Sequence, residues 1–368
     1  MIPVTRPYLP DREKLDRYID GIYERGWLTN NGPLFHELTS RLKEYLAVDN
    51  LLLVGNGTLA LQVAYRALGI SGRNGSVEAI TSPFTFAATA ASLKWESVEP
   101  VFADIDSRTW CLDPKRIESA VTGDTRAIVP VHVFGSPCDV MGIQRIAERH
   151  DLKVVYDAAH AFGVTYKGNS VLGYGDAATL SFHATKLFHC IEGGAIIFKD
   201  REVLERARSM INFGFDQSGA ISEIGINAKM NEFQAAMGLC VLDEMAENLA
   251  GREAVWRRYE KNLSGYVELQ QRPREASNNY SYFPILLGSE SRVVECQRTL
   301  EKEGLTARRY FYPSLNTVYD TGNRSAPGKA EDVSQRVLCL PIYESLPLEV
   351  VDRVCRIVIQ NTDTNVVR

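Results

Sequence analysis

The sequence predicts an α/β fold, with a mostly parallel sheet flanked by helices in a large domain and a smaller α+β domain after it. From about residue 50, short apolar, β-branched runs alternate with segments of helical periodicity. Alternation of this kind is typical of parallel strands that helices cover on both faces. Near residue 231 the pattern changes to one or two long helices that lead away from that sheet. We therefore expect a large domain over residues 1–240, which includes an N-terminal arm, and a small domain over residues 241–368.

The strands of the large domain are expected where apolar runs are short. Between two of them, helical spacing of the apolar residues, such as Val140, Ile143 and Ile146, predicts a helix over 139–150. The predicted strands are 51–54, 98–105, 127–135, 153–160, 178–182 and 194–199, with helices at 58–68, 113–121 and 139–150 after the first three. In a sheet of this kind, ligands bind beyond the carboxyl ends of the strands.

The small domain is expected to mix helices and strands. The helical pattern over 231–263 leads into it, and a strand-like run follows at 280–288. Helices are predicted over 291–304 and near 347–360. The segment 321–332 is polar and contains several turn-forming residues, so we expect a mobile loop there.

Composition excludes several classes of protein. The 368 residues carry a formal net charge of −5 without a basic block, so no nucleic acid or anionic membrane partner is expected. No apolar run approaches the roughly 20 residues of a membrane helix, and the N-terminus lacks the apolar core of a signal peptide. The seven cysteines are scattered without any C-x-x-C pair, which is typical of free thiols in the cytoplasm.

The segment GNGTLAL, residues 55–61, follows a predicted strand and opens a predicted helix. Backbone amides at such a helix start suit a phosphate group, and glycines allow the phosphate to approach closely. The third glycine of a dinucleotide fingerprint is absent, because Ala60 stands there, and no acidic residue follows at the expected spacing. A single phosphate monoester therefore fits better than a dinucleotide. A tight strand-to-helix turn without any ligand is the other interpretation of this motif.

Asp157 in VVYDAAH stands just past an apolar strand, where its carboxylate would be poorly solvated. A buried carboxylate is unfavourable unless it is paired or well hydrogen-bonded. One interpretation is a counter-ion for a bound cationic ring. The other is a helix N-cap, a position that Asp favours.

The segment LSFHATKLFHCIEGG, residues 180–194, places Ser181 at a strand end and Lys186 in the loop after it. A lysine becomes a nucleophilic amine when its ammonium is desolvated or lies near positive charge. If Lys186 acts as an acid and a base in turn, its surroundings are expected to be both desolvated and positive. An isolated lysine is more often a surface residue, but the two glycines that follow indicate backbone packed tightly beside this one. His183, His189 and Cys190 lack the second cluster that a metal site would need, so no metal is expected.

A phosphate cradle, a carboxylate at a strand end and a lysine in a glycine-flanked loop are together what pyridoxal 5′-phosphate requires. The lysine binds the cofactor covalently, and the carboxylate keeps the pyridine nitrogen protonated so that the ring can act as an electron sink. Each signal alone has an ordinary structural explanation. Their combination on one chain favours this cofactor.

The chain also resembles, nearly from end to end, the DegT/DnrJ/EryC1/StrS family of nucleotide-sugar aminotransferases, which are fold-type I pyridoxal-phosphate enzymes. The motifs that carry the resemblance form an ordered series. They are WLTNNGP (27–33), NGT (56–58), PFTFAATA (83–90), PVHVFG (130–135), YDAAHAFG (156–163), SFHATK (181–186), EGG (192–194), GINAKMNEFQAA (225–236) and LCLP (338–341).

The resemblance implies a role for each matching residue. Lys186 would be the Schiff-base lysine and proton carrier, and Asp157 would pair with the pyridinium nitrogen. Phe86 would stack on the ring. The remaining implied cofactor contacts are Gly57, Thr58 and Ser181 to the phosphate, His160 to the phenolic oxygen and Asn227 to the phosphate of a neighbouring subunit's cofactor, which implies a homodimer with shared sites.

Two positions depart from many relatives. His160 stands where glutamine is common, although an imidazole N–H could donate the same hydrogen bond. The segment FYPSLN, residues 311–316, lacks the histidine that many relatives carry there. Sugar contacts in the small domain are therefore the least certain part of the resemblance, with Arg308, Arg309 and Tyr310 as candidates.

The finer resemblance, in WLTNNGP, SFHATKLFHCIEGG and ARRYFYPSLN, is to the dTDP-4-amino-4,6-dideoxyglucose transaminases. It implies transfer of an amino group from L-glutamate to C4 of dTDP-4-keto-6-deoxy-D-glucose, in ping-pong fashion, for O-antigen or other surface glycans. A C3 aminotransferase acting on a dTDP-3-keto-6-deoxy-hexose shares most of these motifs and remains an alternative. A C3 dehydratase is disfavoured because Lys186 is retained. A non-catalytic regulator that binds the cofactor is a third alternative.

Overall fold

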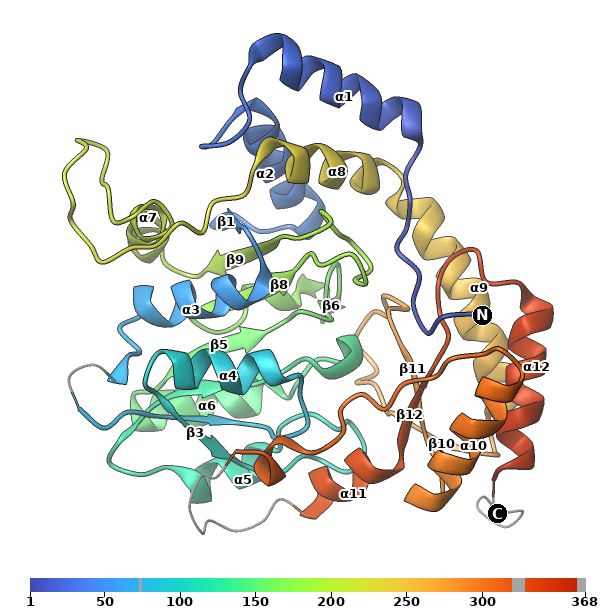
Figure 1. Ribbon diagram of the computed structural model, residues 1–368. Coiled ribbons are helices and arrows are strands. Elements are labelled where there is room, and N and C mark those ends of the chain that lie inside the picture. Colours follow the sequence, from blue (N-terminus) through green and yellow to red (C-terminus); the bar gives the residue numbers. More distant parts are fainter. Residues whose placement is uncertain (73–74, 320–327, 363–368) are drawn as a thin grey trace.

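The computed structural model describes residues 1–72, 75–319 and 328–362 and has a seven-stranded sheet at its centre (Figure 1). The strand order is β1-β9-β8-β5-β4-β2-β3. The strands are β1 (Leu51–Val54), β2 (Glu78–Thr81), β3 (Glu99–Phe102), β4 (Thr125–Val129), β5 (Lys153–Asp157), β8 (Ala177–Ser181) and β9 (Gly194–Phe198). Strand β9 runs antiparallel to both of its neighbours, and the other pairings are parallel. The predicted mostly parallel sheet is confirmed.

Helices cover both faces of this sheet because its strands are apolar on both sides. Leu51 and Leu53 belong to one buried cluster, whereas Leu52 and Val54, which point the opposite way, belong to the other. The first cluster includes residues of α2 (Pro33–Leu46), α6 (Val140–His150) and α8 (Glu232–Asp243), and the second includes residues of α3 (Gly57–Ala67), α4 (Ala87–Trp95) and α7 (Arg201–Met210).

The sequence pattern missed β2 and α4, and some predicted elements are shorter than expected. Strand β2 has four residues and begins with Glu78, so it lacks a continuous apolar run. Helix α4 is rich in alanine and has no polar stripe to reveal its period. The helix predicted over 113–121 is confined to α5 (Pro114–Ile117) and a short 3₁₀ turn, and the strand predicted over 127–135 ends where Pro130 follows Val129.

The C-terminal part has its own core. Helices α9 (Met245–Leu263), α10 (Glu290–Lys302) and α12 (Leu348–Gln360) pack with a three-stranded sheet of β10 (Glu268–Leu269), β11 (Phe283–Leu286) and β12 (Val337–Leu340). Buried residues of α8 belong to the core of the central sheet, and those of α9 from Val255 onward belong to this second core. This grouping supports the proposed division near residue 240.

The predicted mobile loop over 321–332 is wrong for its last part. Residues 328–332 form the start of helix α11 (Gly328–Arg336), and residues 320–327 lie outside the described part of the chain. The carboxylate of Asp104 accepts the backbone N–H groups of Lys329 at 3.1 Å and Ala330 at 2.9 Å. A side chain more than 200 residues away in the sequence therefore caps this helix, which local composition does not reveal.

Helix α2 begins at Pro33, inside the motif WLTNNGP, and its start is held by Glu232 of α8. The Glu232 carboxylate is fully buried and accepts the backbone N–H groups of Leu34 at 3.0 Å and Phe35 at 2.9 Å. A Cβ atom on Gly32 would come within 2.5 Å of the Glu232 side chain, so only glycine leaves room for this contact. The residues of two motifs distant in sequence thus form one cap.

All seven cysteines are free and buried, as predicted. The Cys190 thiol lies against α8, where a Cβ atom on Gly238 would come within 2.7 Å of its sulfur. Burial raises the pKa of this thiol, which disfavours a reactive thiolate. Within the described ranges, no helix is long and apolar enough to cross a membrane.

Replacing Glu232 tests how much this cap stabilises the fold. Glu232→Ala should lower the free energy of unfolding by about 2–4 kcal/mol, because two buried N–H groups lose their acceptor. Glu232→Gln should cost less, because the amide oxygen still accepts one bond. Denaturant unfolding at one fixed protein concentration measures both. Glu24→Ala, on the exposed face of α1 (Arg12–Arg25), is the control, and equal stabilities of Glu232→Ala and Glu24→Ala would contradict the prediction.

Candidate active site

A cavity of about 710 Å³ lies at the carboxyl ends of the parallel strands, where the fold class predicts a ligand site. Its lining includes residues that follow β1, β2, β4, β5 and β8. Among the residues selected from the sequence, it contains Gly57, Thr58, Phe86, Asp157, His160, Ser181, Lys186, Arg308 and Tyr310. Asn227 is exposed and does not line this cavity within its own chain.

One end of the cavity is formed by the start of α3. The Asn56 side chain caps this helix by accepting the Leu59 N–H at 2.9 Å. A Cβ atom on Gly57 would come within 2.7 Å of the Ser181 Cβ, and one on Gly194 within 2.7 Å of the Asn56 carbonyl. These glycines therefore let the helix start, β8 and β9 pack together. First-turn N–H groups beside the Ser181 hydroxyl provide the donors and the positive dipole end that an anion needs.

Asp157 ends β5, and its carboxylate is held by two donors. Thr89 Oγ1 donates to one carboxylate oxygen at 2.7 Å, and the Ala159 N–H donates to the other at 3.1 Å. No helix starts here, because residues 158–163 form turns, so the helix N-cap interpretation is wrong. Burial raises the pKa of Asp157, against the effect of both donors and of the Lys186 ammonium. A cation placed in the cavity would stabilise the ionised carboxylate.

Lys186 lies in the loop between β8 and β9 and points to the same cavity. Its surroundings lower the pKa of the ammonium to about 8, mainly through burial. The predicted desolvation is therefore confirmed, but the predicted positive surroundings are wrong, because the Asp157 carboxylate and the Tyr310 phenol act in the opposite direction. Nζ lies 3.4 Å from the hydroxyl of Tyr282, a partly buried residue that lines the same cavity.

The sequence analysis did not identify Thr89 and Tyr282. Thr89 belongs to the motif PFTFAATA, but nothing in the pattern indicates that its hydroxyl faces Asp157. Tyr282 belongs to the strand-like run 280–288, at the point where the C-terminal part reaches the cavity. Both contacts join segments that are far apart in the chain and need the folded sheet to become visible.

His160 is a buried, neutral imidazole on the cavity wall. Burial holds its pKa well below the usual range. Its Nδ1 accepts the Phe134 N–H at 3.2 Å, so the ring proton resides on Nε2. The rings of Phe134 and Phe311 lie parallel to it, with interplanar angles of 3° and 4°. The ring is thus fixed with a single N–H donor, as the glutamine-to-histidine departure requires. Phe86, by contrast, is 60% exposed and offers a free ring face.

Two of the three sugar-contact candidates line the cavity. Arg308 donates to the Tyr310 hydroxyl at 3.3 Å, and both side chains face the cavity. The Arg309 candidate is wrong, because this side chain turns away to bind Glu290 at 2.7 Å and packs on the ring of Tyr312. His183 also lines the cavity, with Nε2 3.6 Å from the Glu192 carboxylate.

His189 and Cys190 belong to the same loop as Lys186 but do not line the cavity, and both are buried. In the described part of the chain, no three or more His, Cys, Asp or Glu side chains are arranged to hold a metal. The candidate chemistry therefore rests on the Lys186 amine, the Asp157 carboxylate and the anion-binding start of α3.

Comparison with known proteins adds a family to this geometry. Residues 10–359 match the DegT/DnrJ/EryC1/StrS aminotransferase family. The chain belongs to that family. It is 40% identical over 357 residues to a dTDP-4-amino-4,6-dideoxy-D-glucose transaminase of Shigella dysenteriae, covering 95% of this chain and 96% of the relative.

A second relative, from Escherichia coli and with the same name, is 38% identical and covers 97% of this chain and 98% of its own length. The crystal structure of DesI in the presence of its TDP-sugar product superposes with a TM-score of 0.91 at 34% identity, over 98% of this chain and 92% of that one. The predicted family, fold class and enzyme class, an aminotransferase, are confirmed.

The lowered pKa of Lys186 predicts an unusually reactive amine in the cofactor-free protein. The neutral form should be half populated near pH 8, whereas an ordinary lysine has a pKa of 10.5 and reaches that point only near pH 10.5. At pH 7.5 its acylation should then be roughly 100-fold faster than that of an exposed lysine. Competitive labelling with an amine reagent across a pH series, followed by peptide mass spectrometry, measures the midpoint. A Lys186 midpoint equal to that of the exposed lysines in the same digest would contradict the assignment.

Proposed function

We propose that this aminotransferase uses pyridoxal 5′-phosphate to transfer an amino group from L-glutamate to C4 of dTDP-4-keto-6-deoxy-D-glucose. The product would be dTDP-4-amino-4,6-dideoxy-D-glucose, a precursor of O-antigen or other surface glycans. The observation that carries the cofactor assignment is the meeting of the α3 start, Asp157 and Lys186 in one cavity. The choice of sugar is supported by the names of the two relatives at 38–40% identity.

The residues present fit this cofactor. The cradle at Gly57 and Ser181 has backbone close enough to exclude a Cβ atom, as a bound phosphate monoester needs. Asp157 supplies the buried carboxylate for the ring nitrogen, and the Nε2–H of His160 supplies a fixed donor for the phenolic oxygen. When bound, the cofactor supplies an electron sink for the carbon that carries the amino group.

Lys186 is proposed to act as the proton carrier. A pKa of about 8 leaves a useful fraction of neutral amine near neutral pH, so Nζ can take the α-proton of glutamate and return it after the electrons have shifted. The Tyr282 hydroxyl, 3.4 Å from Nζ, holds the amine when it is not bonded to the cofactor. Asp157 keeps the ring nitrogen protonated through its negative charge.

The nucleotide sugar is proposed to enter past Arg308 and Tyr310. A guanidinium on the cavity wall suits the negative diphosphate of a dTDP-sugar, because it binds phosphate oxygens in a bidentate fashion. Tyr310 beside it could donate to a sugar hydroxyl. Both residues come from the C-terminal part, which would therefore select the sugar while the central sheet carries the chemistry.

The active form is proposed to be a cytoplasmic homodimer with shared sites. Asn227 is exposed on its own chain, and the segment around it carries exposed apolar side chains. These are Phe213 (50% exposed), Phe215 (40%), Ile221 (71%), Ile224 (66%) and Ile226 (45%). A patch of this kind supports burial against a second copy, which would carry Asn227 to the neighbouring cofactor phosphate. The seven free thiols support a reducing compartment.

The substrate assignment predicts a specific product. Purified protein with glutamate and dTDP-4-keto-6-deoxy-D-glucose should yield a sugar with an amino group on C4, which NMR of the product identifies. Addition of glutamate alone should bleach the visible band of the lysine-bound cofactor, because the first half-reaction needs no sugar. Amination of a 3-keto-6-deoxy-hexose in preference would favour the C3 alternative. Absence of any spectral change with glutamate would refute the aminotransferase proposal.

Shared sites predict complementation between two inactive variants. Lys186→Ala should abolish turnover, and Asn227→Ala should weaken cofactor binding and activity. When the two are mixed under conditions that allow subunit exchange, each hybrid dimer regains one site with both residues intact. Because about half of the dimers are hybrids, the mixture should recover about one quarter of wild-type activity. A mixture no more active than the sum of its parts, with exchange confirmed by mass spectrometry, would show that Asn227 serves its own chain.

A further inference from the structure

The loop that carries Lys186 is fixed from behind by buried polar contacts. His189, three residues further on, is 2% exposed, and its Nδ1 accepts the Ile191 N–H at 3.3 Å. The ring proton is therefore on Nε2, which donates to the backbone carbonyl of Tyr8 at 2.7 Å. The burial that lowers the pKa of His189 favours this neutral form. The loop is thus tied to a segment 181 residues away.

The acceptor belongs to the N-terminal arm, residues 2–11, which runs from the C-terminal part up to α1 (Figure 1). The far end of the arm is fastened by backbone hydrogen bonds to residues of the C-terminal part. These are Ile2 N to Gly304 O at 2.7 Å, Thr306 N to Ile2 O at 2.9 Å and Ile342 N to Val4 O at 3.0 Å. The arm therefore contacts both parts of the molecule, and Tyr8 at its middle contacts the loop of residues 182–193 on the side away from the cavity.

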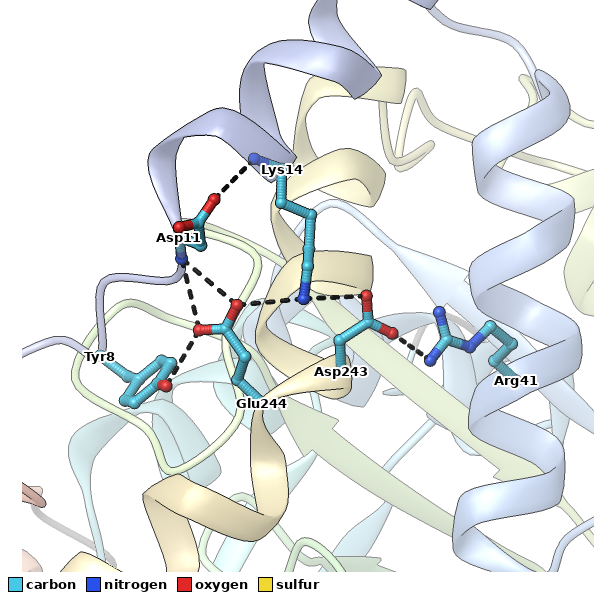
Figure 2. Close-up of polar contacts among 6 residues, drawn as sticks. All are labelled: Tyr8, Asp11, Lys14, Arg41, Asp243 and Glu244. Carbon is cyan, nitrogen blue, oxygen red and sulfur yellow. Dashed lines mark hydrogen bonds and ion pairs between the residues drawn. The ribbon is translucent and has the colours of Figure 1, made fainter.

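The near end of the arm converges on Glu244, between α8 and α9 (Figure 2). Its carboxylate accepts the Tyr8 hydroxyl at 3.0 Å, the Asp11 N–H at 3.3 Å and Lys14 Nζ at 3.1 Å. Asp243 beside it binds Lys14 and Arg41 of α2. One carboxylate thus fixes both the side chain of Tyr8 and the backbone three residues later, which sets the position of the Tyr8 carbonyl.

A second set of contacts, from α9, should keep the loop folded when the bond between His189 and the Tyr8 carbonyl is removed. Asn248 of α9, fully buried, donates to the Leu187 carbonyl at 3.0 Å, and Arg252 in turn donates to the Asn248 side chain at 3.0 Å. The ring of Phe188 also stacks on Phe162 with an interplanar angle of 6°. Loss of the arm contact should therefore shift the loop rather than unfold it.

We propose that His189 is a positioning residue through which the N-terminal arm, anchored by Glu244, sets the place of Lys186 in the active site. The inference rests on the proposed role of Lys186 and adds the element that aligns it. A displacement of about 1 Å at a reacting group costs up to roughly 100-fold in rate. A lysine that must reach both a substrate α-carbon and the cofactor therefore needs a loop with a fixed backbone.

The test compares His189→Leu, which removes both hydrogen bonds, with His189→Gln, whose amide can still donate to the Tyr8 carbonyl. In the holoenzyme, His189→Leu should slow the glutamate half-reaction by about 10- to 100-fold with little change in the apparent KM for glutamate. His189→Gln should recover most of the rate. In the cofactor-free protein, the pH midpoint of Lys186 labelling should shift in His189→Leu and return toward the wild-type value in His189→Gln.

The labelling midpoint does not depend on the aminotransferase reaction, so it separates the two proposals. If wild type turns over no amino donor but the midpoint still shifts in His189→Leu, the proposed function fails and the positioning role stands. If His189→Leu folds and keeps both the midpoint and the half-reaction rate of wild type, the positioning role is overturned. An equal loss in His189→Gln and His189→Leu would also overturn it, since the donor to Tyr8 would then be irrelevant.

If His189→Leu does not fold, Glu244→Ala tests the role of the arm in positioning the loop. It leaves the loop sequence intact and removes the acceptor of Tyr8 and Asp11 in the arm and of Lys14 in α1. Hydrogen exchange of the backbone amides of residues 186–191 should accelerate by at least about tenfold relative to wild type, because the loop loses its fixed acceptor. Glu247→Ala, which changes an exposed glutamate three positions further on in α9, is the matched control and should leave this exchange unchanged. Unchanged exchange in Glu244→Ala would refute the role of the arm.

Discussion

The burial of two opposite charges at one edge of the sheet is the constraint on which the rest of the site depends. Asp157 and Lys186 follow neighbouring strands, and each lowers the cost of the other's ionisation, yet burial still raises the pKa of Asp157 and lowers that of Lys186 to about 8. Removing either charge would take away this mutual electrostatic stabilisation while the other group stays in the cavity. The Thr89 hydroxyl donates to Asp157 and the Tyr282 hydroxyl lies within reach of Lys186, so each charged group has a polar neighbour that does not neutralise it.

The same constraint explains which residues could be predicted from the sequence. Gly57, Asp157 and Lys186 each follow an apolar strand, so local pattern and the topology of a parallel sheet bring them to one edge. The contacts that tune them join distant segments: Thr89 to Asp157 over 68 positions and Lys186 to Tyr282 over 96. No local pattern encodes such a pair. The expected positive surroundings of Lys186 are wrong for the same reason, because Asp157 and Tyr310, both distant in the sequence, act on its pKa in the opposite direction.

The fold, like the site, was predictable where local sequence patterns determine it and not where distant segments meet. The mostly parallel sheet follows from the alternation of apolar runs with helices, because both faces must be buried. The start of α11 could not be predicted, because Asp104 caps it from the central sheet, and β2 was missed because four residues beginning with Glu78 carry too little pattern. Glu232 shows the converse case: the motifs WLTNNGP and GINAKMNEFQAA each look like isolated signatures, whereas in the structure they form a single buried cap.

The loop that carries Lys186, residues 182–193, makes different polar contacts on its two sides: one side faces the N-terminal arm and α9, and the other faces the cavity. Behind, Asn248 and the arm bind backbone and a side chain of the loop through buried groups at 2.7–3.0 Å. In front, Lys186 Nζ has one long contact of 3.4 Å to Tyr282 and a cavity open toward the substrate. The proposed role of Lys186 as a proton carrier needs this asymmetry, because the backbone must stay in place while the amine moves between partners. The arm also contacts both parts of the chain, so the position of the loop that carries Lys186 depends on contacts in both of them.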